Sequence, residues 1–126
     1  MKNVLLDTDI LISFLRGNAL VREEISSLLD TSALHCSVVT IAEIHAGMRE
    51  HEREKTIELL DSLIPVDITP KIAEIAGNYK RTVKSQQLEL DDCFIAASAV
   101  AKQALLVTGN GKHYPMRDIE KKVVSI

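Results

Sequence analysis

The chain has 126 residues, of which 46% are hydrophobic and 26% charged, with a net charge of −3 and a sequence pI of about 5.8. This composition excludes a disordered chain, and no apolar run approaches the roughly 20 residues that a membrane-spanning helix needs. Proteins that bind nucleic acid usually have an excess of basic residues, and this chain has none. The argument against a nucleic-acid substrate is only mild, because an acidic cluster that a cation neutralises would account for part of the negative charge. We therefore expect a single domain over residues 1–126, with no membrane association.

The N-terminal run and the cysteines predict a cytoplasmic protein. Asp7 interrupts the first apolar run, which is unlike a secretory signal. Cys36 and Cys93 lie far apart, with no C-x-x-C pair and no spacing typical of a zinc site. We expect both to be reduced, buried thiols.

Short apolar runs alternate with amphipathic stretches along the chain. In chain order, the pattern predicts a strand at 4–6, helices at 9–15 and 19–29, a strand at 34–39 and a helix at 40–48. A solvated turn at 49–55 then leads to a helix at 56–63, a short strand at 64–68 and a helix from Lys71 towards Lys84 that Thr69 caps. A polar loop, a helix at 91–102, a strand at 105–108, a loop at 109–115 and a strand at 122–126 complete the chain.

This alternation is typical of βαβ crossovers, which join parallel strands. The predicted fold class is therefore α/β: a three-layer sandwich with a mostly parallel central sheet flanked by helices.

Three acids follow predicted strands or begin a predicted helix: Asp7, Glu43 and Asp92. Taken singly, each has a structural explanation, because the helix dipole favours negative charge in a first turn. Thr40 and Glu43 also fit the S/T-x-x-E capping box. Thr8 or Asp9 is expected to cap the first helix.

Taken together, the three acids point to a metal site at one edge of the sheet. Crowded carboxylates repel one another unless protons or a cation offset the charge, and such oxygen ligands suit Mg²⁺ or Mn²⁺. Asp91 is expected to be the N-cap of the last long helix, with Asp92 pointing inward. Asp9 fits either a cap or an outer-shell partner of the ion.

Four motifs, in order, resemble a PIN domain, and most closely the small toxins called VapC. They are Leu5-Leu6-Asp7-Thr8, Thr40-Ile41-Ala42-Glu43, Asp92-Cys93-Phe94-Ile95-Ala96-Ala97 and Thr108-Gly109-Asn110. The resemblance covers the chain from Val4 to about Tyr114.

The resemblance implies a metal-dependent endoribonuclease that acts as the toxin of a type II toxin–antitoxin pair. Asp7, Glu43 and Asp92 would be the catalytic, metal-coordinating acids, with Thr8 and Asn110 orienting them. It also implies an RNA substrate, a homodimer, and an antitoxin whose C-terminal segment covers the acidic cleft. His113 stands near the place where the family often has a fourth acid, which puts a second metal ion in doubt.

Two other readings stay open. The chain could be a PIN-like interaction scaffold with an incomplete metal site. Less favoured is a Mg²⁺-dependent phosphatase, which Asp7-Thr8-Asp9 suggests, although Leu11 stands where such enzymes need Thr or Val.

Overall fold

The computed structural model describes residues 1–126, the whole chain, as five strands, six α-helices and two short 3-10 turns. The strands are β1 (Lys2–Leu6), β2 (Ser32–Ser37), β3 (Ile64–Val66), β4 (Leu105–Thr108) and β5 (Glu120–Val123). The α-helices are α1 (Thr8–Leu15), α2 (Ala19–Leu28), α3 (Val38–Gly47), α4 (Arg53–Asp61), α5 (Pro70–Thr82) and α6 (Leu90–Ala101). The 3-10 turns are η1 (Glu50–Glu52) and η2 (Gly111–His113). None of the helices combines the length and the apolar character needed to cross a bilayer.

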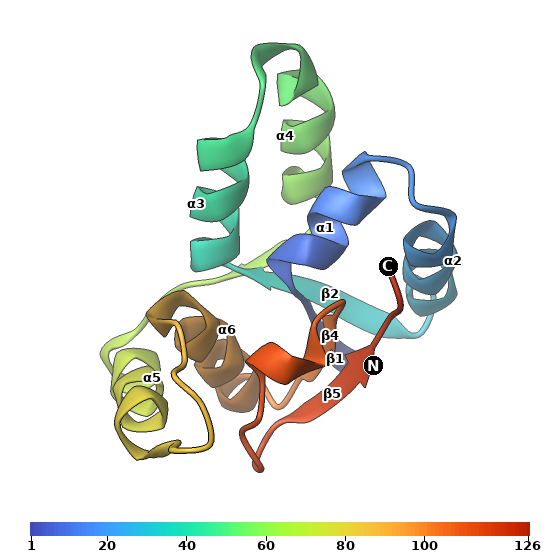
Figure 1. Ribbon diagram of the computed structural model, residues 1–126. Coiled ribbons are helices and arrows are strands. Elements are labelled where there is room, and N and C mark those ends of the chain that lie inside the picture. Colours follow the sequence, from blue (N-terminus) through green and yellow to red (C-terminus); the bar gives the residue numbers. More distant parts are fainter.

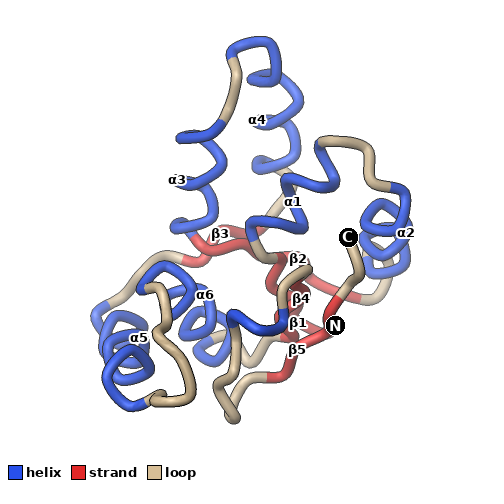
Figure 2. Tube along the Cα trace, in the orientation of Figure 1, coloured by secondary structure: helices blue, strands red, loops and turns tan.

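The five strands lie together in one sheet (Figure 2). Their order is β3-β2-β1-β4-β5, and every neighbouring pair is parallel. The predicted α/β sandwich is therefore confirmed, and its sheet is wholly parallel. From β1 the chain first builds one side of the sheet, with β2 and β3, and later the other side, with β4 and β5. The direction of building reverses between β1 and β4, and ligands of open α/β sheets bind beside the carboxyl ends of strands at such a point.

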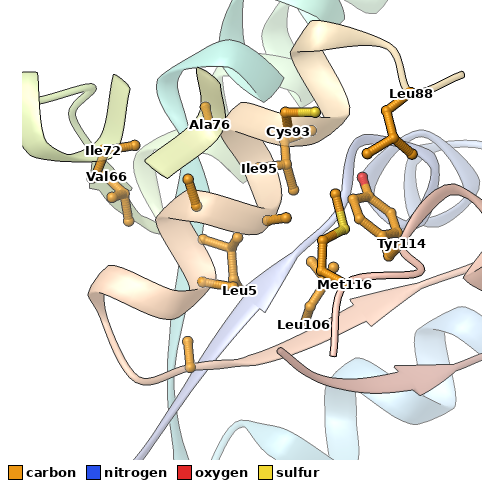
Figure 3. Close-up of a cluster of buried hydrophobic side chains, with 14 residues drawn as sticks. Leu5, Val66, Ile72, Ala76, Leu88, Cys93, Ile95, Leu106, Tyr114 and Met116 are labelled. Atoms are coloured by element: carbon orange, nitrogen blue, oxygen red, sulfur yellow. The ribbon is translucent and has the colours of Figure 1, made fainter. Parts of the chain in front are cut away.

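Each face of the sheet carries its own hydrophobic core. On one face, Val4 and Leu6 of β1 pack with residues of α1, α2 and α3. On the other face, Leu5 and Leu106 pack with α5, α6 and the buried Tyr114 (Figure 3). The consecutive apolar residues of β1 are thus explained by a strand that is covered on both sides.

The helices α3 and α4 form a hairpin that projects away from the sheet, as Figure 1 shows in green. Ile44 of α3 belongs to the core that contains Ile10 and Leu11 of α1, so the base of the hairpin is anchored beside the first helix. This anchoring brings one side of α3 towards the carboxyl end of β1.

The boundary between the second strand and the third helix was predicted two residues too late. The strand ends at Ser37, and α3 begins at Val38 instead of Thr40. The hydroxyl of Ser37 accepts a hydrogen bond from the Val39 amide (3.1 Å), which caps the helix. This cap outweighs the strand preference of the two valines.

Other predicted boundaries of helices and strands differ from the structure by a few residues. The predicted turn at 49–55 contains η1 and the start of α4, and the Glu52 carboxylate accepts from the Arg49 amide at 2.9 Å to begin this segment. The last strand lies at Glu120–Val123 instead of 122–126, because this segment pairs in register with β4.

The two cysteines lie in different cores, Cys36 with the α1 face and Cys93 with the α6 face. Both are free thiols, as expected. Burial raises the pKa of Cys36 to about 11 and also raises the pKa of Cys93. Both side chains therefore stay protonated at neutral pH.

Replacement of Leu106 by alanine tests the packing of the α6 face. Leu106 is fully buried, so Leu106→Ala should lower the free energy of unfolding by about 2–5 kcal/mol in urea denaturation. Leu20→Ala is the matched control, because Leu20 is 56% exposed and its truncation should change stability by less than about 0.5 kcal/mol. Equal losses in the two variants would contradict this assignment of the core.

Candidate functional site

An acidic cleft opens at the carboxyl ends of β1 and β4, where the direction of the sheet reverses. Its volume is about 350 Å³, and Ile12 is its only hydrophobic lining residue. The other lining residues are Asp7, Thr8, Asp9, Glu43, Glu89, Asp91, Asp92, Asn110 and His113. The structure thus brings Asp7, Glu43 and Asp92, which are far apart in the sequence, to one cleft.

Asp7 is held at the centre of this cleft by two strand ends. The residue is 6% exposed, and its carboxylate accepts from the Thr8 amide at Oδ1 (2.8 Å) and from the Thr108 hydroxyl at Oδ2 (2.7 Å). The same hydroxyl accepts from the Asn110 amide at 3.1 Å. Asp7, and neither Thr8 nor Asp9, is the N-cap of α1, so the predicted cap was wrong. Asp7 is thus both the N-cap of α1 and a residue of the acidic cleft.

Glu43 is the sixth residue of α3, one turn beyond the helix start. The predicted capping box with Thr40 was therefore wrong, because Ser37 caps this helix. The Thr8 hydroxyl donates to Glu43 Oε1 at 2.7 Å and lies 3.0 Å from the Thr40 hydroxyl. Glu43 therefore has no capping role. Its carboxylate contacts Thr8 and lines the acidic cleft.

The environment of Glu43 disfavours its charged form. Desolvation by burial raises the pKa of Glu43 to about 7, and the nearby carboxylates of Asp91 and Asp7 add to this rise. The hydrogen bond from Thr8 opposes the rise. A cation in the cleft would restore the ionised carboxylate.

Asp92 is the third residue of α6, and its two oxygens face different partners. The Tyr114 hydroxyl donates to Oδ1 at 3.4 Å, and His113 Nδ1 lies 3.3 Å from Oδ2. Burial raises the pKa of Asp92 to about 6; His113 lowers it, while Asp91 and Asp7 raise it further.

Asp91 is not the N-cap of α6, as had been predicted, because the helix begins one residue earlier and Glu89 occupies the cap position. The Asp91 carboxylate instead accepts from the amide of Asp92 at 3.0 Å. This bond orders the first turn of α6, from which Asp92 enters the cleft.

Asp9 also lines the cleft, and it ties α1 to the loop after β4. Both of its oxygens accept from the Gly109 amide, at 3.1 and 3.2 Å. Burial, and then the charge of Asp7, raises the pKa of Asp9. The sequence left two roles open for Asp9, a helix cap or an outer-shell partner of the ion, and the structure excludes the cap.

Asn110 and His113 complete the wall of the cleft on the side of β4. The side-chain amide nitrogen of Asn110 lies 3.0 Å from His113 Nε2, and the His113 side chain is 52% exposed. His113 therefore faces Asp92 with one nitrogen and Asn110 with the other.

Two residues near the acids, Glu89 and Tyr114, were missed at the level of sequence, and Thr40 was named only as a cap and a motif residue. Tyr114 is fully buried, and its ring packs in the core of the α6 face (Figure 3). Its hydroxyl reaches Asp92 at 3.4 Å. Burial and the charges of Asp7 and Asp92 raise the pKa of this phenol strongly, so it remains a hydrogen-bond donor. The only signal in the sequence that could have placed Tyr114 near the acids was its position in the loop that follows Thr108 and Asn110.

The donor chemistry of the cleft fits a hard divalent cation. Six carboxylates, from Asp7, Asp9, Glu43, Glu89, Asp91 and Asp92, share the cleft with one imidazole. No three His, Cys, Asp or Glu side chains are already grouped so that they could hold an ion. Binding therefore requires the carboxylates to move closer together.

The sequence matches the family model described as "PIN domain" over residues 4–119. Ribonuclease VapC10 of Mycobacterium tuberculosis is 36% identical over 115 residues, which cover 90% of this chain and 86% of that protein. Ribonuclease VapC19 of the same species is 30% identical, with 89% of this chain and 92% of that protein covered.

Solved structures share the fold. VapBC2 from Rickettsia felis, bound to a DNA fragment from its promoter, superposes with a TM-score of 0.88 and 20% identity, covering 98% of this chain and 99% of that one. VapBC-1 from nontypeable Haemophilus influenzae gives a TM-score of 0.81 at 24% identity, covering 96% and 97%. The family match over nearly the whole chain and the 36% identical relative confirm the resemblance seen in the four motifs: this chain belongs to the PIN-domain family.

Proposed function

We propose that the chain is a metal-dependent endoribonuclease of the VapC kind, in which Asp7, Glu43 and Asp92 hold Mg²⁺ or Mn²⁺. The observation that carries this proposal is the meeting of acids from three separate elements in one cleft, at the ligand-binding edge of the sheet. The ribonuclease relatives with 36% and 30% identity support RNA as the substrate.

A divalent ion held by Asp7, Glu43 and Asp92 would lower the pKa of a bound water and would stabilise negative charge on a phosphodiester. The chain's own residues prepare the site. Asp7 is immobilised by Thr108 and the Thr8 amide, and Thr8 also orients Glu43. Such outer hydrogen bonds fix the direction of the coordinating oxygens.

The loop after β4 completes the support. Asn110 faces His113, and Asp9 fixes this loop through the Gly109 amide. Asp91 orders the turn that carries Asp92. Near the place where the family often has a fourth acid, this chain has His113, whose imidazole faces Asp92. We therefore favour a site with one tightly held ion.

The biological role that we propose is that of a toxin controlled by an antitoxin protein. The similar folds in the VapBC complexes support this role. An arginine from an antitoxin segment would satisfy the carboxylates of the cleft by charge-assisted hydrogen bonds and would block access to it. We further propose that the toxin acts in the cytoplasm as a homodimer.

Loss of one acid should abolish cleavage without unfolding the protein. Asp92→Asn keeps the shape of the side chain and removes its charge, and outer-shell losses alone typically cost 10–100-fold. We therefore expect the rate of RNA cleavage in Mn²⁺ to fall by more than about 100-fold. The assay incubates the protein with total RNA and maps the new ends. Asp30→Asn is the control, because exposed Asp30 precedes β2 at the opposite edge of the sheet.

Folding of both variants is checked by circular dichroism and thermal denaturation. Undiminished cleavage by folded Asp92→Asn protein would refute the assignment. If the wild-type protein itself cuts no RNA, a small phosphate monoester tests the phosphatase alternative, and inactivity on both substrates favours the interaction scaffold.

The raised pKa of Glu43 predicts a pH-dependent stability. The folded carboxyl has a pKa of about 7, against 4.5 for an ordinary glutamate, so the folded state binds more protons between these values. The metal-free protein should therefore lose stability as pH rises from about 4.5 to 7, relative to Glu43→Gln protein. Thermal denaturation of both proteins across this range measures the difference, which should be flat above and below it. A difference that grows in the opposite sense would contradict the shift.

Added Mn²⁺ should reverse this loss, because coordinating carboxylates must be ionised. We expect Mn²⁺ to raise the melting temperature of the wild-type protein more at pH 8 than at pH 5.5, and to raise that of Asp92→Asn protein much less at either pH. Equal metal-induced shifts in the two proteins would argue against Asp92 as a ligand.

Co-expression with the neighbouring open reading frame tests the antitoxin. A tagged copy of this chain should retain that partner in a pull-down, and the complex should cleave less RNA than the free protein. Recovery of the chain alone, with no harm to its host, would contradict the proposed role.

A further inference from the structure

We propose that a groove beside the acidic cleft binds the RNA backbone on one side of the scissile phosphate, with Lys112 and Lys121 as its phosphate contacts. This inference rests on the proposed ribonuclease function. The groove lies between the loop that follows β4 and strand β5, has a volume of about 870 Å³, and includes Gln86, Asn110, Gly111 and Val123 in its lining.

The groove and the acidic cleft are continuous at Asn110, which lines both. An RNA strand with one phosphate among the acids therefore has a direct path across this residue. No carboxylate lines the groove, whereas six line the cleft. The sign of the local charge changes from negative to positive within the length of one short loop.

A strand of RNA is a polyanion, and it can bind beside an acidic cleft only where positive charge lies close by. The carboxylates of the cleft repel the phosphates on either side of the one that the metal ion would hold, so binding energy must come from positive charge nearby. Contacts of lysine with phosphate supply it and carry no sequence information.

The two lysines present their charge differently. Lys112 is exposed, and its ammonium group makes no hydrogen bond or ion pair within the chain. Lys121 Nζ donates to the carbonyls of Gly111 (2.9 Å) and Tyr114 (2.8 Å), which fixes its position at the groove and leaves one N–H for a ligand.

The backbone of the groove is packed in place. A Cβ atom at Gly111 would lie 2.7 Å from the Val123 side chain, so glycine allows the loop to approach β5 this closely. Gln86 donates to the Lys112 carbonyl at 2.8 Å and connects the loop before α6 to the same wall. Both contacts lower the cost of ordering Lys112 when it binds a phosphate.

The composition of the groove selects backbone contacts over base contacts. Val123 is its only hydrophobic residue, and it has no aromatic side chain on which a base could stack. On the other side of Glu43, the chain has a smaller cavity of about 130 Å³, whose charged lining residues are Arg16, Glu43 and Glu52. The two carboxylates outnumber the one cation there, and the rest of the lining is largely apolar, so this cavity suits phosphate less well than the groove does.

The test measures RNA affinity without cleavage. A fluorescein-labelled 12-nucleotide RNA of mixed sequence is titrated with protein in EDTA at several salt concentrations, and binding is followed by anisotropy. Lys112→Ala should weaken binding about tenfold, as expected for one lost charge-assisted contact. It should also reduce the slope of log K against log salt by about 0.7.

Two matched variants separate this contact from a change in net charge or fold. Lys71→Ala removes the same charge from an exposed site on α5 that lines neither the groove nor the cleft, and it should leave affinity and slope unchanged. Lys112→Arg should restore most of the affinity. In Mn²⁺, Lys112→Ala should raise KM for cleavage and leave kcat within about twofold, because the contact binds substrate and transition state alike.

The groove is refuted if Lys112→Ala and Lys71→Ala proteins bind this RNA with the same affinity and salt slope, or if the wild-type protein does not bind it at all. Lys112→Gln replaces Lys112→Ala in every comparison if the alanine variant is unstable. Normal cleavage with an unchanged KM in the variant would overturn the groove alone. A wild-type protein that cuts no RNA would overturn the proposed function itself.

Discussion

The hydrogen bond from the Thr108 hydroxyl to Asp7 is the contact around which the site is arranged. It joins the carboxyl ends of β1 and β4, the two strands between which the order of the sheet reverses. Because Asp7 also caps α1, the same carboxylate fixes the start of the helix that carries Thr8 and Asp9. Thr8 then reaches Glu43, and Asp9 reaches the Gly109 amide. The positions of the remaining parts follow from this one buried acid.

Crowded carboxylates oppose the compactness that the two cores favour. Burial raises the pKa of Glu43 to about 7 and that of Asp92 to about 6, and the neighbouring carboxylates of Asp91 and Asp7 add to both rises. In the metal-free chain the repulsion is moderated by hydrogen bonds from Thr8 and Tyr114 and by the nearby imidazole of His113. The site is therefore partly relaxed before any ion binds, and its carboxylates must move closer together when one does.

Local patterns were sufficient to predict the parallel sheet and the meeting of the acids at its edge. A strand such as β1 is apolar throughout because both its faces are covered, and Asp7 stands out at its end. The start of α3 was misplaced because Val38 and Val39 favour strands, while the hydroxyl of Ser37 decides the boundary. A capping box involving Glu43 was inferred from that wrong start.

The remaining parts of the site depend on contacts between distant segments. Tyr114 carries no motif, and its burial under α6 arises only once both elements pack together. The role of Asp9 depends on Gly109, one hundred residues away. In the same way, the sequence separates Lys112 from Lys121, and only the pairing of β4 with β5 brings them to one groove.

The placement of the two thiols on opposite sides of the sheet has a practical consequence for spectroscopy. Maleimide dyes react with thiolates, and the native cysteines are both buried and protonated at neutral pH. A single cysteine introduced at an exposed surface position can therefore be labelled selectively in the otherwise native chain. Distances between such a dye and a bound oligonucleotide then become measurable by energy transfer.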